Sequence, residues 1–310
     1  MKVLVCGDMH LKQGIILPRV EACAAELGVG RIIFMGDYVD GLFVFPSDQL
    51  AALELQSSWI DGQRARGVEV DCLMGNHDAS YLGGVETSKT LQRFFGEFDE
   101  ISHALGKLNL KPAASFGPWL LTHAGVTLEW AEKLASGACT ADDLVSTLNA
   151  LEPSRCDESG LCSVGPGRHG FGLPGPLWAH RTELSSDPFP GISQVVAHSP
   201  RKTCERVDAS RPDVLLGAFA GCGVEGSRGG EASSYGEGCE LWFVDTHAIS
   251  MYKRQVSGDG SILLLDDETK EATVVHPEEF GCEPWKAAAR RWLDELVTRD
   301  DEIWKKRPEA

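Results

Sequence analysis

The sequence contains no Cys-x-x-Cys pair, no internal repeat and no long run of apolar residues. A membrane-spanning helix needs about 20 predominantly apolar residues, so nothing in the chain predicts a contact with the membrane interior. Basic residues are also few: 29 Lys and Arg stand against 46 Asp and Glu, which gives a formal net charge of -17. This deficit argues against a broad nucleic-acid-binding face, because such a face needs an excess of cations.

The ten cysteines are scattered along the chain. Cys6 and Cys72 lie in predicted strands and Cys23 in a predicted helix, where buried free thiols are common. The first predicted strand begins at the second residue, so we expect no signal peptide and a cytoplasmic protein with reduced cysteines. Cys156 and Cys162 could bracket a small zinc loop or form a disulfide, although no second pair has ligand spacing.

The chain has 310 residues, of which 43% are hydrophobic, which is enough for a sizeable core. Three short β-rich runs each end in a glycine that is followed by residues of the metal-ligand type. The runs are 2–6 before Gly7-Asp8-Met9-His10, 31–35 before Gly36-Asp37-Tyr38-Val39-Asp40, and 68–74 before Gly75-Asn76-His77-Asp78. In an α/β sheet, residues that follow neighbouring strands collect at one edge, where ligands bind.

Two helices are predicted between these strands. Apolar spacing indicates a helix over Ile15–Leu27, which Gly28 and Gly30 end. A second helix is predicted over Asp48–Arg64 with Ser47 as its N-cap. Its core-facing residues are expected to be Leu50, Leu53, Leu55 and Trp59. Crossover helices of this length indicate a parallel sheet over residues 2–75.

The middle of the chain continues the alternation of helix and strand. We expect a helix over Thr90–Leu105, a strand over Trp119–Thr122 that leads to His123, and helices over Leu128–Leu151 with a break near Ser136-Gly137. A Gly/Pro-rich surface loop follows at 153–176, and the strand at 194–197 leads to His198.

The last third of the chain is predicted to close the fold. A Gly/Ser-rich loop at 217–238 precedes closing strands within 241–275, whose hairpin-like spacing predicts a second sheet. A helix within 284–305 carries an apolar docking stripe at positions 285, 288, 289, 292, 293 and 296.

Side chains that can bind metals therefore end five separate strands. They are Asp8 and His10, Asp37, Asn76 and His77, His123, and His198. Carboxylate, imidazole and amide donors together suit Mn, Fe or Zn, and an aspartate can bridge two ions. Two ions about 3.5–4 Å apart can clamp the oxygens of a phosphoryl group. The set predicts a dinuclear metal site.

These motifs, together with Ala197-His198-Ser199, resemble the calcineurin-like metallophosphoesterase superfamily. Its serine/threonine phosphoprotein phosphatases and their bacterial and phage relatives are the most similar branch. The motifs run from 7 to 198 in the family's order, and the strands that follow Val244-Asp245-Thr246 resemble its closing strands. The resemblance implies one α/β domain over 1–310, with two packed mixed β-sheets flanked by helices.

The resemblance also implies roles for individual residues. Asp8 and His10 would hold a first metal ion, and Asp37 would bridge to a second. The second ion would be held by Asn76, His123 and His198. His77 would be the general acid, oriented by Asp40, and a metal-activated hydroxide would attack phosphorus directly. The cofactors implied are two divalent ions, with Mn first and Fe, Zn, Ni or Mg as the other choices.

The sequence departs from the family pattern at the phosphate clamp. The phosphatases carry an arginine where this chain has Gly41. Smaller departures are Leu11 for the usual glycine, Asp78 for glutamate, and Ala124 for the first glycine after the histidine. A guanidinium suits phosphate, and the replacement candidates are Arg181, in Trp178-Ala179-His180-Arg181, and Arg168 in the Gly-rich loop.

These observations predict a metal-dependent phosphatase acting on phosphomonoesters, including phosphoserine or phosphothreonine in proteins. The altered position at Gly41 keeps an alternative open, a dinucleoside polyphosphate hydrolase or phosphodiesterase of the same superfamily, such as a diadenosine tetraphosphate hydrolase. A metal-binding scaffold without turnover is a third hypothesis, although His77 and Asp40 are both present. The expected partner is a phosphorylated substrate, either a phosphoprotein or a small phosphoester.

Overall fold

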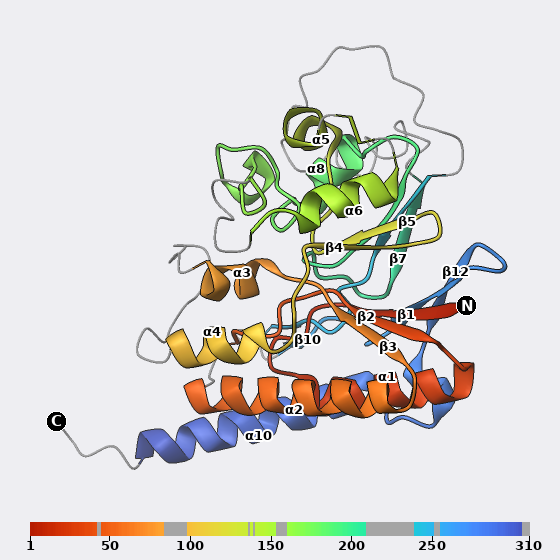
Figure 1. The fold of residues 1–310 in the computed structure, drawn as a ribbon. Helices are drawn as coiled ribbons and strands as arrows, with labels where there is room; N and C mark the ends of the chain where they lie inside the picture. The colour runs from red at the N-terminus through yellow and green to blue at the C-terminus, as the bar shows by residue number, and fades with distance from the viewer. Residues whose placement is uncertain are drawn as a thin grey trace.

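Two mixed five-stranded sheets form the centre of the molecule, and helices cover their outer faces (Figure 1). This α/β arrangement was predicted from the sequence, and the computed structural model confirms it. The structure describes all residues except 42–44, 84–97, 136, 139, 153–159, 209–238, 251–254 and 306–310. The predicted loop at 217–238, the start of the helix predicted at 90–105, and Cys156 lie outside the described residues.

The first sheet has the strand order β12-β11-β1-β2-β3. Its members are β1 (Lys2–Cys6), β2 (Arg31–Phe34), β3 (Glu69–Cys72), β11 (Ile262–Asp266) and β12 (Glu271–Val275). β1, β2 and β3 are parallel, as predicted, because α1 (Gln13–Leu27) and α2 (Pro46–Ala65) provide the crossovers. These two helices and α10 (Trp285–Lys305) lie together over the outer face of this sheet (Figure 1).

The second sheet has the strand order β4-β5-β6-β8-β7. Its members are β4 (Ala113–Phe116), β5 (Trp119–Thr122), β6 (Ser193–Val196), β7 (Glu205–Asp208) and β8 (Glu240–Phe243). On its outer side lie α5 (Leu128–Leu134), α6 (Ala141–Asn149) and α8 (Arg181–Ser186) (Figure 1). The remaining elements are α3 (Asn76–Leu82), α4 (Phe98–Gly106), β9 (Ile249–Ser250), β10 (Gln255–Val256) and the 3-10 turns η3 (Pro166–Arg168) and η4 (Pro277–Phe280).

The side chains of each strand alternate between the two faces of its sheet. In β1, Val3 and Val5 enter the core between the sheets, whereas Leu4 and Cys6 pack under the helices. Both faces are therefore apolar, as expected for a strand that is covered on both sides. Full burial of an aliphatic side chain contributes roughly 1.5–3 kcal/mol. This core holds the ends of the strands in fixed positions.

The prediction that the closing strands make the second sheet is only partly correct. β8 joins that sheet, but the β11–β12 hairpin pairs with β1 and extends the first sheet. The physical reason is the two-sided burial of β11. Leu263 and Leu265 fill the core between the sheets, and Ile262 packs under the helices.

Two details of the α2 prediction are wrong. The helix begins at Pro46 with Phe45 as the N-cap, not Ser47, because proline is favoured in the first helical turn and Asp48 Oδ2 accepts a hydrogen bond from Phe45 N at 2.7 Å. Leu55 is not a core residue, since 45% of it is exposed. Ile60 is buried instead. Among the described residues, no helix combines the length and apolar character that a membrane span requires.

Candidate metal centre

The side chains that can bind metals, which follow five different strands, lie close together. Two groups of ligand atoms each lie within 4.8 Å of one another. One group is His10, Asp37 and His77, and the other is Asp37, His123 and His198. Asp37 belongs to both groups, so its carboxylate occupies the position that a bridging ligand needs.

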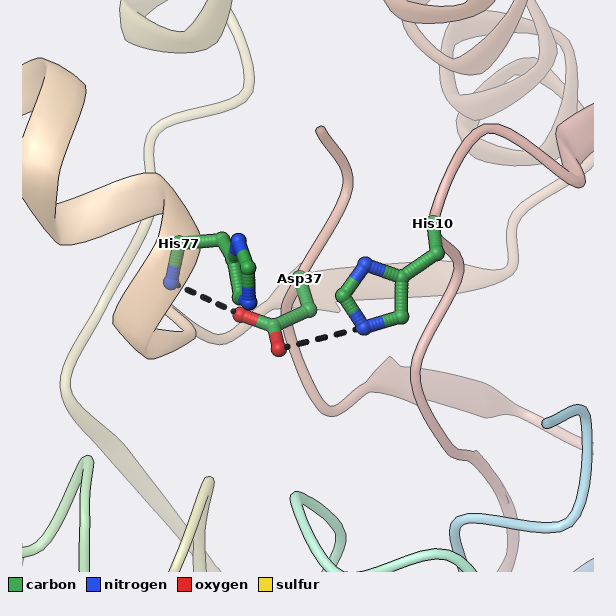
Figure 2. Close-up of side chains that lie close together, drawn as sticks. All are labelled: His10, Asp37 and His77. Atoms are coloured by element: carbon green, nitrogen blue, oxygen red, sulfur yellow. Dashed lines mark hydrogen bonds and ion pairs between the residues drawn. The ribbon is translucent and has the colours of Figure 1, made fainter. Parts of the chain in front are cut away.

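Asp37 lies between His10 and His77 (Figure 2). Its Oδ1 accepts a hydrogen bond from the backbone N–H of His77 at 3.0 Å. Its Oδ2 lies 3.5 Å from His10 Nε2 and 3.5 Å from His123 Nε2. One carboxylate oxygen therefore faces imidazoles from both sheets.

Asp8 and Asn76 complete this ring of donors. Asp8 Oδ2 lies 3.9 Å from His10 Nε2, and Asp8 Oδ1 accepts a hydrogen bond from the backbone N–H of His198 at 3.3 Å. Asn76 Oδ1 lies 3.0 Å from His123 Nε2. The structure thus brings together all the residues that the sequence proposed as metal ligands.

The backbone is strained at the same place. Of the eight non-glycine residues with positive φ that the structure describes, five belong to the strand-end motifs. They are His10 (41°), Leu11 (62°), Asp37 (54°), Asp40 (61°) and His198 (59°). Such residues cost energy and persist only where the surroundings fix them, and they cluster at functional sites. The glycine that the resembling family carries at the position of Leu11 would avoid this cost.

Two glycines allow the β2 and β3 ends to meet. A Cβ on Gly36 would lie 2.5 Å from Gly75 N, and one on Gly75 would lie 2.1 Å from Asp37 Oδ1. Neither distance is possible for a real side chain. Asp78 then joins the two ends, because its carboxylate accepts backbone hydrogen bonds from Asp37, Tyr38 and Gly75.

Hydrogen bonds at the far side of the rings fix how the imidazoles point. His10 Nδ1 donates to the Asp40 carbonyl at 3.1 Å, and His123 Nδ1 donates to the Met35 carbonyl at 2.8 Å. A carbonyl can only accept, so Nδ1 carries a proton in both rings and Nε2 is the nitrogen that faces Asp37. His198 Nε2 is buried and has no hydrogen-bond partner within the described part of the chain. A buried orphan nitrogen among carboxylates fits a metal ligand.

The pKa values of the histidines divide them into two kinds. Burial lowers the pKa of His10 to about 3 and that of His198 well below its usual value. Both are therefore neutral, as a metal ligand must be. Burial also opposes the charge on His123, but Asp37 and Asp8 raise its pKa to about 10. In the absence of cations, His123 carries the charge that balances these carboxylates.

Asp40 and Asp37 are the carboxylates that make His77 a proton donor. His77 Nδ1 lies 2.8 Å from Asp40 Oδ2. Burial opposes protonation of His77, but Asp37 and then Asp40 outweigh it and raise the pKa to about 9. Cations bound to Asp37 would weaken its contribution and leave Asp40 as the main partner. The Asp40 carboxylate therefore fixes one side of the His77 ring, and the group of His10 and Asp37 lies on its other side.

Two residues that support this pair were not found from the sequence. Tyr81 donates its hydroxyl to Asp40 Oδ1 at 2.7 Å, and Gln49 Oε1 accepts the backbone N–H of Asp40 at 3.0 Å. Tyr81 stands four residues after His77 on α3, one helical turn away, which is a spacing that brings side chains onto one face. No sequence pattern indicates Gln49, because its contact with Asp40 depends on where α2 packs.

The two candidate arginines lie in different surroundings. Arg168, on the short turn η3, donates from Nη2 to the His198 carbonyl at 3.2 Å and to Ser199 Oγ at 3.3 Å. Burial lowers its pKa, which Asp8 and Glu183 oppose. Arg181 is the first residue of α8. The pKa of His180 is lowered to about 4, first by burial, then by the charge of Arg168 and then by that of Arg181. Arg168 thus contacts the segment that carries His198, one of the proposed metal ligands.

Residues 1–150 match the family model for calcineurin-like phosphoesterases. A point mutant of a cold-active protein tyrosine phosphatase has a similar solved structure, with a TM-score of 0.52 and 16% identity over 89% of this chain and 78% of that chain. A metallophosphoesterase from Sphaerobacter thermophilus gives a TM-score of 0.45 and 17% identity over 97% of this chain and 99% of that one. No curated protein matches the chain significantly.

At such identities, the structural likeness concerns the fold alone. Together with the match of the N-terminal half and the clustered donors, it defines the class of protein: a hydrolase of phosphoric esters with a site for divalent metal ions. Residues 1–150 of the chain belong to the calcineurin-like metallophosphoesterase family.

Proposed function

We propose that this enzyme hydrolyses phosphomonoesters with two divalent metal ions, and that phosphoserine or phosphothreonine in proteins is its substrate class. The first ion would be held by His10 together with Asp8 and Asp37, whose carboxylates lie 3.9 Å and 3.5 Å from His10 Nε2. The second would share Asp37 and be held by Asn76, His123 and His198. When bound, such ions neutralise phosphoryl oxygens and lower the pKa of water.

The donor types favour Mn²⁺ as the ion to test first. Carboxylates from Asp8 and Asp37 are hard ligands, while the histidines suit later transition metals. The set contains no thiolate within reach, since the described cysteines near the strands are buried inside the core. The described cysteines are free thiols.

The His77–Asp40 pair is the observation that carries the proposal. An alkoxide is a poor leaving group and must be protonated as the P–O bond breaks. His77 holds a proton beside the metal-type group, and Asp40 fixes its ring at 2.8 Å. A phosphoanhydride releases a phosphate, which needs no such help because its pKa is near 6. A built-in proton donor therefore favours serine and threonine esters over anhydrides.

Turnover with Mn²⁺ tests this proposal directly. We expect faster hydrolysis of a phosphoserine or phosphothreonine peptide than of diadenosine tetraphosphate, and loss of both activities with a chelator. A phosphotyrosine peptide is tested beside these substrates, because its phenolate leaves more easily than an alkoxide. The comparison shows whether the enzyme prefers esters of aliphatic hydroxyls or of phenols. Faster cleavage of the dinucleotide would instead favour the polyphosphate hydrolase. Two bound ions with no turnover on any substrate would favour the scaffold.

We propose that Arg168 binds the substrate phosphate in place of the arginine that Gly41 replaces. Arg168→Ala is expected to lower kcat/KM about 10- to 100-fold, mainly through KM, because a charge-assisted hydrogen bond contributes about 1.5–3 kcal/mol. The bound metal content should not change. The matched control is Arg181→Ala, on the neighbouring helix α8, for which we expect a smaller loss. A larger loss in Arg181→Ala would assign the clamp to Arg181.

A further inference from the structure

Phe171 is the most exposed large hydrophobic residue that the structure describes. Its side chain is fully exposed, whereas the next most exposed one, Met1, is 50% exposed. Water disfavours an exposed aromatic ring, but single apolar residues on a protein surface are common. Exposure alone therefore assigns no role to Phe171, and its role depends on the loop that carries it.

This loop is fixed to the backbone of residues 163–164. Gly172 N donates a hydrogen bond to the Val164 carbonyl at 3.0 Å, and Gly175 N donates to the Ser163 carbonyl at 2.9 Å. A Cβ on Gly170 would overlap the Val164 carbonyl oxygen, so this position requires glycine. The backbone on both sides of Phe171 is thus held in place, while the Phe171 ring projects into solvent.

The same loop carries Arg168, the proposed phosphate ligand, three residues before Phe171. Arg168 Nη2 donates to the His198 carbonyl at 3.2 Å, and Glu183 Oε1 accepts a hydrogen bond from Gly167 N at 2.8 Å. These bonds hold the loop beside the metal centre. Consecutive Cα atoms are about 3.8 Å apart, so the Cα atoms of Arg168 and Phe171 lie within about 11 Å of each other.

A peptide that is bound by its phosphate would extend past this ring. An extended chain advances about 3.3 Å per residue, so three residues cover the distance from Arg168 to Phe171. An apolar side chain within about three positions of the phosphorylated residue can therefore cover the ring. Because the loop is already fixed, little conformational freedom is lost when such a contact forms. A small phosphoester has no side chain that could make it.

We propose that Phe171 is a specificity-determining residue, which binds an apolar side chain of a polypeptide substrate close to the phosphorylated serine or threonine. This inference deepens the proposed function and rests on it, since it requires a phosphopeptide whose phosphate is held beside Arg168. Phe171 takes no part in cleavage of the P–O bond. Its contact is the same before and during the reaction, so it should act through KM rather than kcat.

Two phosphoserine peptides that differ only in apolar content test the proposal. One carries leucine two residues before and two residues after the phosphoserine, where side chains of an extended peptide point to the same side, and the other carries serine at both positions. With Mn²⁺, the parent enzyme is expected to hydrolyse the leucine peptide with about tenfold higher kcat/KM, through a lower KM. Phe171→Ala should reduce this ratio to about twofold or less, and Phe171→Leu should retain most of it.

The matched control is Leu55→Ala. Leu55 is 45% exposed on α2, which covers the outer face of the first sheet, so its removal should leave the ratio of the two peptides as in the parent (Figure 1). A parent enzyme without a preference for the leucine peptide would overturn the proposal. So would a Phe171→Ala variant that keeps the preference.

Two other results would assign Phe171 a different role and overturn the proposal. An equal loss of kcat on both peptides in Phe171→Ala would mean that Phe171 only shapes the loop. A change of oligomeric state in Phe171→Ala, measured by gel filtration, would place the ring in an interface between copies of the chain. Hydrolysis of neither peptide by a parent chain with two bound Mn²⁺ ions would overturn the proposed phosphopeptide substrate itself, a result distinct from a missing preference.

Discussion

Asp37→Asn is expected to lower turnover ~10³-fold or more and to reduce the bound Mn²⁺ from two ions to at most one per chain. The Asp37 carboxylate is the only group shared by both clusters of metal-type atoms that the structure describes. Its Oδ2 lies 3.5 Å from Nε2 of His10 and of His123, so a cation bound to either ring would also meet this oxygen. An amide oxygen carries no net charge and cannot bridge two ions as strongly.

Asparagine is a sharper test than alanine at this position. It keeps an oxygen that can accept the backbone N–H of His77, so the strand end should hold its shape. The measurement is metal content by elemental analysis after gel filtration, together with turnover on the phosphopeptide. The folded state is checked by thermal unfolding with and without Mn²⁺. Two bound ions and unchanged turnover in Asp37→Asn would show that Asp37 is not the bridging ligand.

The part of this centre that could be predicted from the sequence is the part set by local geometry. A strand, a glycine and a polar residue form a short unit, and parallel strands bring several such units to one edge. For this reason the sequence alone predicts that Asp8, Asp37 and Asn76 lie together, at the ends of the parallel strands β1, β2 and β3. His123 and His198 followed the same logic from β5 and β6.

The residues that were missed depend on contacts between distant segments. Asp245 lies next to the Gly7-Asp8 segment only because β8 pairs with β6 and its end packs against Gly7, which no local pattern reveals. Gln49 reaches Asp40 only after α2 packs on the sheet. The pairing of β11 with β1 is of the same kind, since the local pattern predicts a hairpin but not which strand it pairs with.

The two arginines show why loops are the hardest part to predict. Arg168 approaches His198 because Glu183, near the start of α8, accepts a hydrogen bond from Gly167 N at 2.8 Å and so holds the turn in place. Neither the Gly/Pro content of the loop nor its length specifies that bond. Arg181 had the clearer motif, but its position at the start of α8 places its charge near His180.

His77→Ala is expected to slow turnover of a phosphoserine peptide by 10²- to 10⁴-fold while both ions stay bound. His77 is not in the proposed ligand set, and its Nδ1 is held by Asp40 at 2.8 Å, so its removal should take away a proton donor and little else. Metal analysis on the same samples separates this result from the loss expected for Asp37→Asn.

The size of the effect should depend on the leaving group. A substrate such as p-nitrophenyl phosphate releases a stabilised phenolate, which needs little protonation, so His77→Ala should slow its hydrolysis much less than that of an alkyl phosphate. Tyr81→Phe is the matched control, because it removes only the hydroxyl that donates to Asp40 Oδ1 at 2.7 Å. We expect a loss of less than tenfold from that variant. Equal losses of alkyl and aryl phosphate turnover in His77→Ala would mean that His77 binds the phosphate rather than protonating the leaving oxygen.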